Sequence, residues 1–486
     1  MSNIESKEPI GIEADVEMVA SQTSFDPKHT HKVHWYRSTM FQAFVTGAAS
    51  FMGVGLFNAL SATGAGGLQN TYTSHPVSAN SSMALGWGPM IPIAWMASGI
   101  ISKLGPKWAL FYGTLGYIFY AAALYTNSAY GNQWFVMFGA FLSAMTSGVF
   151  FPVEGAIITI YPEPWYKGRA LALWQSMYRA APLIGGAINM AFNYQNVKTG
   201  GLAPKTYLVF VGLMVLAPLS SLLLSPPEKV QRTDGSPVPS FPKESMWVEF
   251  KETMKTLKDP KIISLSVLWA QPLFAPALLG TFLAKHFSVR VRALSSLVLP
   301  VVEIILFQVI GYVVDKTNIP VRKRMTWVWI PLNVLSLGSM IWMFVNIVVM
   351  DKNYPTRAYD WTTPGFAQIW TCVILATALP YVACGFYYVL AGYSFPINSS
   401  GIRLTRVMSQ LRAAEAGGAA VAYGMLAGGA SFTVAGACNL ALLVVCIGVG
   451  CHLLLEVRKQ DLDGKFTRDT MAASQLVGLE SVEEEK

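Results

Sequence analysis

Long stretches without a charged side chain constrain this chain more than any other feature. Charged residues are absent from Ser38 to Ser102, from Trp108 to Val153 and from Met325 to Met350, and further charge-free runs follow. Charged residues make up 13% of the 486-residue chain, against about 25% in soluble domains. A membrane-spanning helix needs about 20 apolar residues, so each run holds one or two spans. We therefore predict an all-α, polytopic membrane protein.

Twelve spans can be drawn through these runs, in two sets of six. The predicted parts are a cytoplasmic tail at 1–37, a six-helix bundle at 38–225, a cytoplasmic linker at 226–261, a second six-helix bundle at 262–455 and a cytoplasmic tail at 456–486. The predicted spans are 40–62, 80–101, 107–126, 133–160, 167–192, 205–224, 262–284, 294–314, 325–349, 366–391, 402–427 and 432–455.

The distribution of lysine and arginine predicts the orientation of these spans. If both termini are cytoplasmic, more of the basic residues in short loops lie inside than outside, as in most membrane proteins. The cluster Lys285–Arg292 would lie outside and breaks this rule. Asn80 begins an Asn-Ser-Ser sequon on the outer side and is a candidate for glycosylation, although it abuts a span. Nothing in the sequence chooses between the plasma membrane and an internal membrane.

The linker contains an amphipathic segment. A helix over 246–257 would place Trp247, Phe250, Met254 and Leu257 on one face, beside several lysines. This pattern is typical of a helix that lies on an anionic membrane surface. A soluble linker helix is the alternative.

Two arginines lie in related stretches, at Arg179-Ala-Ala-Pro-Leu-Ile-Gly-Gly-Ala187 and Arg412-Ala-Ala-Glu-Ala-Gly-Gly-Ala419. Their separation, 412 − 179 = 233, is close to half of the chain. An arginine at the centre of a membrane helix costs about 2.5–3.5 kcal/mol on insertion scales, so each should have a polar partner. The echo indicates a duplicated architecture with a polar centre, and chance similarity in a Gly/Ala-rich sequence is the alternative.

Glu154, in the fourth predicted span, is the expected partner of Arg179, because a lone buried charge is costly. In one interpretation Glu154 exchanges a proton while Arg179 binds an anionic or polar solute. In the other, the two form a static salt bridge between helices. Helical spacing places Gln175 and Asn189 on the same face as Arg179, so both are candidate solute contacts.

Three further polar positions are predicted within the spans. Arg412 and Glu415 are three residues apart on one helix and can neutralise each other, which favours a static ion pair. Glu303 lies one turn after Pro300, where the exterior water is within reach, and ranks lower as a site residue. Asn58 is either a solute contact or a hydrogen bond between helices.

The sequence contains no enzyme, nucleotide-binding or metal-binding motif that we recognise. We predict no enzymatic activity, no cofactor, no metal and no nucleic-acid partner. The predicted partners are a small solute, protons in one interpretation, the lipid bilayer and, in the alternative function below, another membrane protein.

Two loops carry a family resemblance, each after the second span of its half. Gly311-Tyr-Val-Val-Asp315-Lys-Thr-Asn318, followed by Arg322-Lys-Arg324, resembles the Gly-x-x-x-Asp-x-x-Gly-Arg-Lys loop of the major facilitator superfamily. Asn318 replaces the second glycine, and the equivalent loop in the first half has Ser102 instead of the aspartate. A carboxylate at a helix end that faces basic residues forms a latch favouring one gate state, so Gly311, Asp315 and Arg322 are predicted gate-loop residues.

A sharper resemblance is to the fungal uncoordinated-ninety-three-like (Unc-93-like) branch of that superfamily. It is carried by Gly55-Leu-Phe-Asn-Ala-Leu-Ser-Ala-Thr-Gly-Ala-Gly-Gly67, Glu154-Gly-Ala-Ile157, Gly186-Ala-Ile-Asn189 and Leu224-Ser-Pro-Pro-Glu-Lys-Val230. The resemblance implies a twelve-span transporter fold built from two parallel six-helix repeats. It implies no particular substrate, because the family includes proposed transporters and regulatory partners of channels and receptors. Two functions follow: a secondary transporter working by alternating access, or a non-transporting regulatory or trafficking partner.

Overall fold

A computed structural model describes residues 32–62, 79–163, 165–193, 204–238, 245–316, 318–354, 359–394 and 401–464. Over these ranges the chain is helical, with two isolated β-bridges and no β-strand. The predicted all-α class is confirmed.

The first half begins with η1 (Trp35–Arg37) and ends before the linker. The helical segments that follow are α2 (Thr39–Ser50), the π-helical η2 (Phe51–Gly55), α3 (Leu56–Ala62), α4 (Ala79–Trp87), α5 (Met90–Tyr130), α6 (Trp134–Ile160), α7 (Lys167–Asn193), α8 (Pro204–Met214) and α9 (Leu216–Ser221). The linker contains the short η4 (Pro227–Lys229) and α10 (Met246–Thr256).

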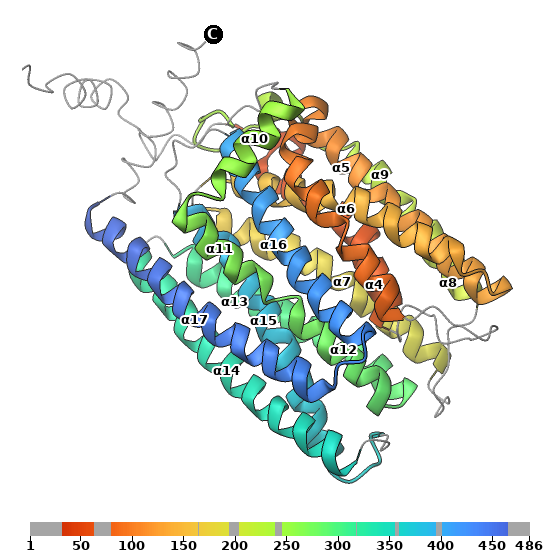
Figure 1. The fold of residues 1–486 in the computed structure, drawn as a ribbon. Coiled ribbons are helices and arrows are strands. Elements are labelled where there is room, and N and C mark those ends of the chain that lie inside the picture. The colour runs from red at the N-terminus through yellow and green to blue at the C-terminus, as the bar shows by residue number, and fades with distance from the viewer. Residues whose placement is uncertain are drawn as a thin grey trace, which may run out of the picture.

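The second half contains seven helices within the described ranges. They are α11 (Pro260–Ala270), α12 (Phe274–His286), α13 (Val289–Val314), α14 (Val321–Asn353), α15 (Phe366–Ser394), α16 (Gly401–Ala427) and α17 (Phe432–Leu462). Figure 1 shows the long helices of both halves running side by side, with α10 across one end of the bundle, which we call the linker end.

Each of the twelve predicted spans falls on one helix, on part of one, or on two or three consecutive helical segments of the described chain. Helix α5 contains two spans, joined at Gly105, which has a φ of 75° and is followed by Pro106. A positive φ of this kind suits glycine, and proline suits the first turn of the helix that follows. Eight helical segments of the described chain are long and apolar enough to cross a membrane; α7 and α16, which carry Arg179 and Arg412, are not among them.

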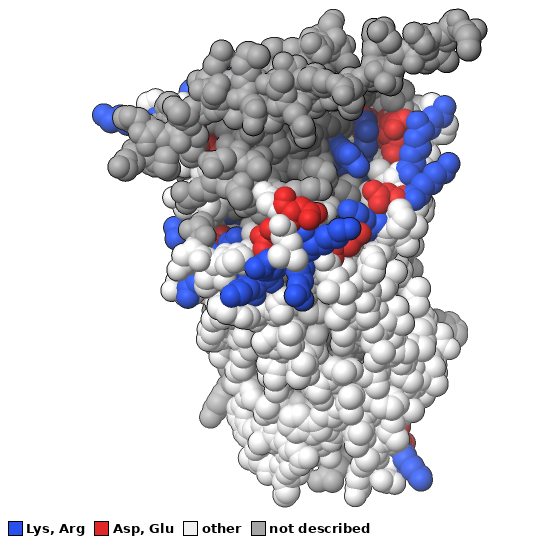
Figure 2. Space-filling view, turned by 90° about the vertical axis from the view of Figure 1, so that its left-hand side faces the viewer, with Lys and Arg blue, Asp and Glu red and all other residues white. Residues whose placement is uncertain are grey.

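The surface has the charge distribution of a membrane protein. Figure 2 shows lysine, arginine, aspartate and glutamate gathered toward the linker end, above a broad belt with almost no charge. Exposed side chains of the long helices include Phe138, Ile305, Val334 and Val445, all of which suit contact with lipid. The multi-pass membrane protein predicted from the charge-free runs is confirmed.

Helices α7 and α13 join the two halves by close backbone approach. A Cβ atom on Gly311 would lie 2.8 Å from the carbonyl oxygen of Gly168, and one on Gly186 would lie 2.7 Å from Ser296 Oγ. Larger side chains would therefore force the helices apart, which explains two of the glycines in the family-like segments.

One helix extends past a predicted span. Helix α17 continues to Leu462, beyond the predicted start of the C-terminal tail at 456, because its last turns pack and pair with other elements: Asp461 interacts with Arg322 and Glu456 with Lys261. The predictions for 1–31 and 465–486 lie outside the described residues.

Candidate functional site

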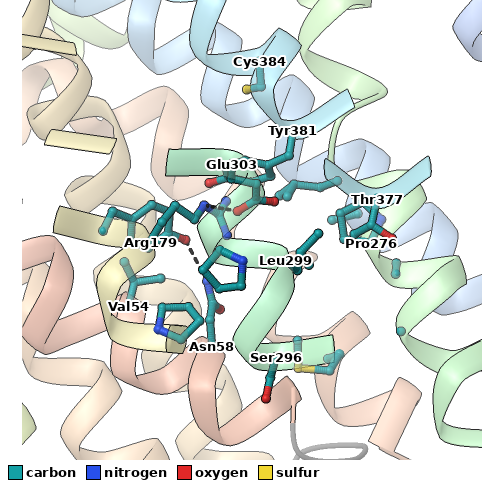
Figure 3. Close-up of a pocket in the computed structure, with 18 of the residues that line it drawn as sticks. Val54, Asn58, Arg179, Pro276, Ser296, Leu299, Glu303, Thr377, Tyr381 and Cys384 are labelled. Atoms are coloured by element: carbon teal, nitrogen blue, oxygen red, sulfur yellow. Dashed lines mark hydrogen bonds and ion pairs between the residues drawn. The ribbon is translucent and has the colours of Figure 1, made fainter. Parts of the chain in front are cut away.

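A cavity of about 410 Å³ lies between the two halves. Figure 3 shows its side chains converging from both halves, with Arg179 on α7 facing Glu303 on α13. Much of the wall is aromatic, and the polar groups are few and buried, as in most small-molecule sites. The aromatic residues that line it are Trp87, Phe151, Trp174, Tyr178, Tyr381, Tyr388 and Tyr423.

Arg179 forms the first ion pair of the cavity. Its Nε lies 3.0 Å from Glu303 Oε2, with 9% and 2% of the two side chains exposed. The guanidinium carbon lies 3.3 Å from the ring centroid of Tyr381 and 4.7 Å from that of Tyr178, so the cation is held between aromatic faces. Within the described chain, Nη2 has no hydrogen-bond partner. Glu303 therefore holds Arg179 through Nε, while Nη2 remains able to donate a hydrogen bond to a ligand.

This arrangement corrects two sequence predictions. Glu154 is not the partner of Arg179, because Glu303 from the other half occupies that position. Glu303 is only 1% exposed, so it does not reach exterior water as predicted; the helical turn after Pro300 turns its side chain into the cavity wall. Glu303 is a full member of the site.

Arg412 forms the second ion cluster, together with two carboxylates. Its Nη2 lies 3.2 Å from Glu154 Oε1, and its Nη1 donates to Glu415 on the same helix. Ser50 donates a hydrogen bond of 2.7 Å to the other oxygen of Glu154, and Trp174 donates to Ser50 over 3.1 Å. The predicted local pair of Arg412 and Glu415 is present, but it is one side of a triad.

Both ion clusters connect the halves of the chain. Glu303 on α13 meets Arg179 on α7, and Arg412 on α16 meets Glu154 on α6. Any motion that separates the halves at this depth must break or rearrange these contacts. Arg179, Glu303 and Glu154 would then lose their ionic partners, while Arg412 would keep Glu415. A buried charge without a partner costs several kcal/mol.

The other predicted site residues have different surroundings. Gln175 lines the cavity, is 3% exposed, and its Oε1 has no partner within the described chain. Asn58 also lines the cavity and donates a 2.7 Å hydrogen bond to the hydroxyl of Tyr178, the interhelical role considered above. Asn189 lies in α7, but its side chain is outside those described.

Asn80 is part of the cavity wall as well. Its Oδ1 accepts a 3.1 Å hydrogen bond from Thr281 of the second half. A glycan on Asn80 would need this side chain to leave that contact, so glycosylation there stays a prediction that the geometry does not favour.

The gate loop lies at the linker end and contacts the other half. Asp315 accepts hydrogen bonds from the backbone N–H groups of Gly168, at 2.9 Å, and Arg169, at 2.8 Å. Both donors lie in the first turn of α7. A carboxylate at a helix N-terminus is electrostatically favourable. Burial nevertheless raises the pKa of Asp315 to about 6, and the two N–H donors and Arg169 only partly offset it.

Arg322, the third predicted gate-loop residue, does not face Asp315. Its side chain lies 3.8 Å from Asp461 on α17, and its backbone N–H donates to the same carboxylate. The basic partner of Asp315 is Arg169, whose Nε lies 3.7 Å away. The latch therefore joins the two halves rather than two parts of one loop.

Helix α10 is fixed to the same end of the bundle. Arg406 on α16 donates two hydrogen bonds, of 2.9 and 2.7 Å, to the fully buried carboxylate of Glu249. On another side, Trp247 stays 62% exposed and stacks on Phe250. The exposed Trp247, beside the half-buried Phe250, suits the predicted interfacial helix, which remains a prediction.

Two buried charged residues of the cavity received little or no weight from the sequence. One is Glu303, and the other is Arg292, which the sequence analysis assigned to an outer loop. Arg292, Ser296, Leu299 and Glu303 are spaced so that they share one face of α13. This spacing is the sequence signal that could have placed both charged residues in the cavity wall. In the described chain no group of three or more histidine, cysteine or acidic residues is placed to hold a metal ion.

The fold is that of a membrane protein of the major facilitator type. The chain is similar to the crystal structure of a major facilitator superfamily transporter, FucP, in the outward conformation, with a TM-score of 0.58. The match covers 85% of this chain and 99% of that one at 12% identity, which shows the fold alone.

Sequence comparison then defines the family. The notoamide biosynthesis cluster protein O′ of Aspergillus versicolor is 30% identical over 457 residues, 90% of this chain and 97% of the relative. UNC93-like protein 1 of Arabidopsis thaliana is 27% identical over 309 residues, 63% of this chain and 66% of the relative. The family profile described as "Ion channel regulatory protein UNC-93" matches residues 80–275. The chain belongs to the Unc-93-like family, as the sequence motifs predict.

Proposed function

We propose that this protein is a secondary transporter that moves a small organic or ionic solute across a membrane by alternating access. The observation that carries the proposal is the buried Arg179, which faces a central cavity of about 410 Å³ with unused donor capacity. An arginine in this position is costly in a membrane unless it has a function or a full set of partners. Arg179 has only part of such a set.

The solute would bind in competition with Glu303. A polar group on the solute would use Arg179 Nη2 and weaken the contact to Glu303 at 3.0 Å. Because that contact joins the two halves, its replacement by a solute would couple binding to their relative motion. Ligands shift such equilibria only by binding one state better than the other.

The Arg412 cluster is the proposed site of proton coupling. It contains one guanidinium and two carboxylates, Glu154 and Glu415, all of them buried. With every group ionised, the cluster would have a net charge of −1 in a membrane interior, which is expensive. One proton on the carboxylate pair neutralises it, and its release would accompany a change in access.

A regulatory or trafficking partner of a channel or receptor is the second candidate function. The family profile described as an ion channel regulatory protein favours it, over residues 80–275. In that case the two ion clusters would be static and hold the halves together. The name of the Aspergillus relative, from a biosynthesis cluster, instead suits movement of a small organic molecule. In either case we propose a non-enzymatic protein with both termini in the cytoplasm.

Two successive experiments test the transporter proposal. An untargeted metabolite comparison of cells with and without the protein selects solutes, and the flux of each is then measured in proteoliposomes. We expect at least one solute to move in a protein-dependent, saturable way, and Arg179→Gln to abolish that flux. Protein-dependent flux of none of the selected solutes would favour the regulatory candidate.

A further inference from the structure

Arg292 is a second buried arginine of the cavity, and it has no carboxylate partner. It lies in the first turn of α13, is 2% exposed and lines the cavity. None of its three guanidinium nitrogens has a hydrogen-bond partner in the part of the chain that the structure describes. Its state differs from that of Arg179 and Arg412, each of which meets at least one glutamate.

The acidic residues nearest in the fold are occupied. Asp360 accepts a 2.6 Å hydrogen bond from Nε of Arg290, which lies two positions before Arg292 on α13. Asp360 also accepts a hydrogen bond from the hydroxyl of Ser288. The hydrogen bonds from Arg290 hold the pKa of Asp360 well below its usual range, so that carboxylate stays ionised and engaged. Glu303 lies eleven residues further along α13, about 16 Å along the helix axis, and pairs with Arg179.

The surroundings of Arg292 are polar near the start of α13 and apolar beyond it. Ser295 and Ser296 line the cavity, and their hydroxyl groups donate to the backbone carbonyls of Val291 and Ala293. Thr281 and Asn80, which hydrogen-bond to each other near the ends of α12 and α4, also line it. The cavity wall between Arg292 and Arg179 includes the apolar residues Leu299 and Pro300. A cation thus sits at one end of an apolar, aromatic-lined space.

We propose that Arg292 is an anion-binding subsite that takes the single oxyanion group of an organic solute, such as a carboxylate, phosphate or sulfonate. A guanidinium binds such a group through two parallel N–H donors, which gives both affinity and orientation. The apolar or aromatic body of the solute lies along α13 toward Tyr381 and Arg179. This inference rests on the proposed transport function and specifies its substrate class.

The charges of the whole cavity fit a monoanion. The three arginines, Arg179, Arg292 and Arg412, face three glutamates, Glu154, Glu303 and Glu415. When one proton occupies the Arg412 cluster, the cavity has one positive charge in excess, at Arg292. One organic monoanion neutralises it, so that proton and anion are bound together without net charge.

Binding of benzenesulfonate to the purified full-length protein in detergent tests the subsite. This probe stays ionised at every working pH, and benzenesulfonamide is its neutral counterpart of nearly the same shape. We expect benzenesulfonate, but neither benzenesulfonamide nor an equal concentration of potassium chloride, to raise the thermal unfolding temperature in a saturable way. Arg292→Gln should weaken the affinity about ten- to hundredfold, because charge-assisted hydrogen bonds are lost.

Arg290→Gln is the matched control, since it removes an arginine two positions away that is paired with Asp360 outside the cavity wall. It should leave the affinity for benzenesulfonate unchanged. If Arg292→Gln does not fold, protection of the wild-type Arg292 from phenylglyoxal by benzenesulfonate, read by peptide mass spectrometry, provides the same information. An equal response to both probes, or unchanged binding in Arg292→Gln, or no protection of Arg292, would overturn the proposal.

The outcome is separable from that of the transport proposal. Binding that depends on Arg292 without flux of any solute would support the subsite and contradict transport. Flux that is unchanged in Arg292→Gln would support transport and overturn the subsite.

Discussion

The two arginines of the duplicated stretch have become different sites. Arg412 is held by two carboxylates, Glu154 and Glu415, whereas Arg179 is held by Glu303 alone. Each keeps a buried guanidinium nitrogen without a hydrogen-bond partner within the described chain. Both are buried and both join the halves, so burial and position do not explain the difference. The number of carboxylates does. An arginine between two carboxylates suits a proton-holding cluster, and one with a single carboxylate suits a ligand.

The largest expected effect separates the two arginines by stability. Arg179→Ala leaves one buried carboxylate, Glu303, without a cation, which should cost about 3–5 kcal/mol. Arg412→Ala leaves two, and should cost clearly more. Thermal or denaturant unfolding of the purified protein measures both.

Arg403→Ala is the matched control for this pair, because Arg403 is exposed on the same helix as Arg412. It should change stability by less than about 0.5 kcal/mol. Equal destabilisation by Arg179→Ala and Arg412→Ala would remove the distinction between the clusters.

The latch at the linker end contributes a pH dependence that must be separated from that of the clusters. The pKa of Asp315 is raised from 3.8 to about 6, chiefly by burial, so the closed contact binds the proton more tightly than the separated halves do. The contribution of Asp315 to the free energy of unfolding is therefore fully present below about pH 4 and is lost as the pH rises through about 6. At 1.36 kcal/mol per pKa unit, the change is roughly 3 kcal/mol.

Asp315→Asn should remove this dependence, because asparagine does not titrate. Unfolding temperatures measured from pH 4 to pH 8 should show a flatter profile for this variant than for the wild type. Asp461→Asn, at the same end of the bundle, should keep the wild-type slope. A profile for Asp315→Asn that is parallel to the wild type would show that the latch does not titrate in this range.

A smaller effect is expected from the carboxylate that competes for Arg179. Glu303→Gln removes a negative charge from the cavity that also contains Arg292, so the anion benzenesulfonate should bind about tenfold more tightly, or about 1.4 kcal/mol. Glu415→Gln, in the other cluster, should leave the affinity within about twofold, since Arg412 keeps Glu154. Weaker binding in Glu303→Gln would mean that Glu303 itself supports the ligand site.

The smallest effect concerns Asn58. Its hydrogen bond to the hydroxyl of Tyr178 is neutral, so Asn58→Leu should cost about 1 kcal/mol of stability. If Asn58 contacts the solute as well, the affinity for benzenesulfonate should also fall. Tyr178→Phe, which removes only the shared hydroxyl, distinguishes the two roles: an equal loss of stability without loss of affinity would make Asn58 purely structural.

The sequence predicts the fold far better than the partners of its charged residues. Charge-free length defines most of the spans, although α7 and α16, which carry Arg179 and Arg412, are not among the apolar segments. The kink at Gly105 falls between two predicted spans because Gly-Pro interrupts a helix. The partner of Arg179 depends on which helices of the two halves lie side by side, which local periodicity does not contain. Glu154 was the nearer candidate along the chain, and Glu303 is the nearer one in space.

The same limitation applies to Arg292 and Arg322. A basic residue near the end of a span reads as a loop residue in a one-dimensional pattern, yet Arg292 turns into the cavity wall because its face of α13 continues to Glu303. Arg322 belongs to the predicted gate motif but meets Asp461, from a helix that the sequence ended too early. In each case the missing information is a long-range contact.

The division of tasks between the two clusters is tested most directly by proton-driven flux in proteoliposomes. The solute is the one selected by the metabolite comparison, and the wild type is compared with Glu154→Gln and Glu303→Gln, with and without an imposed pH gradient. We expect a gradient to accelerate wild-type flux, Glu154→Gln to lose that acceleration, and Glu303→Gln to keep it with an altered apparent affinity. A gradient effect that persists in Glu154→Gln, or is lost in Glu303→Gln alone, would contradict a proton site at Arg412 and a solute site at Arg179.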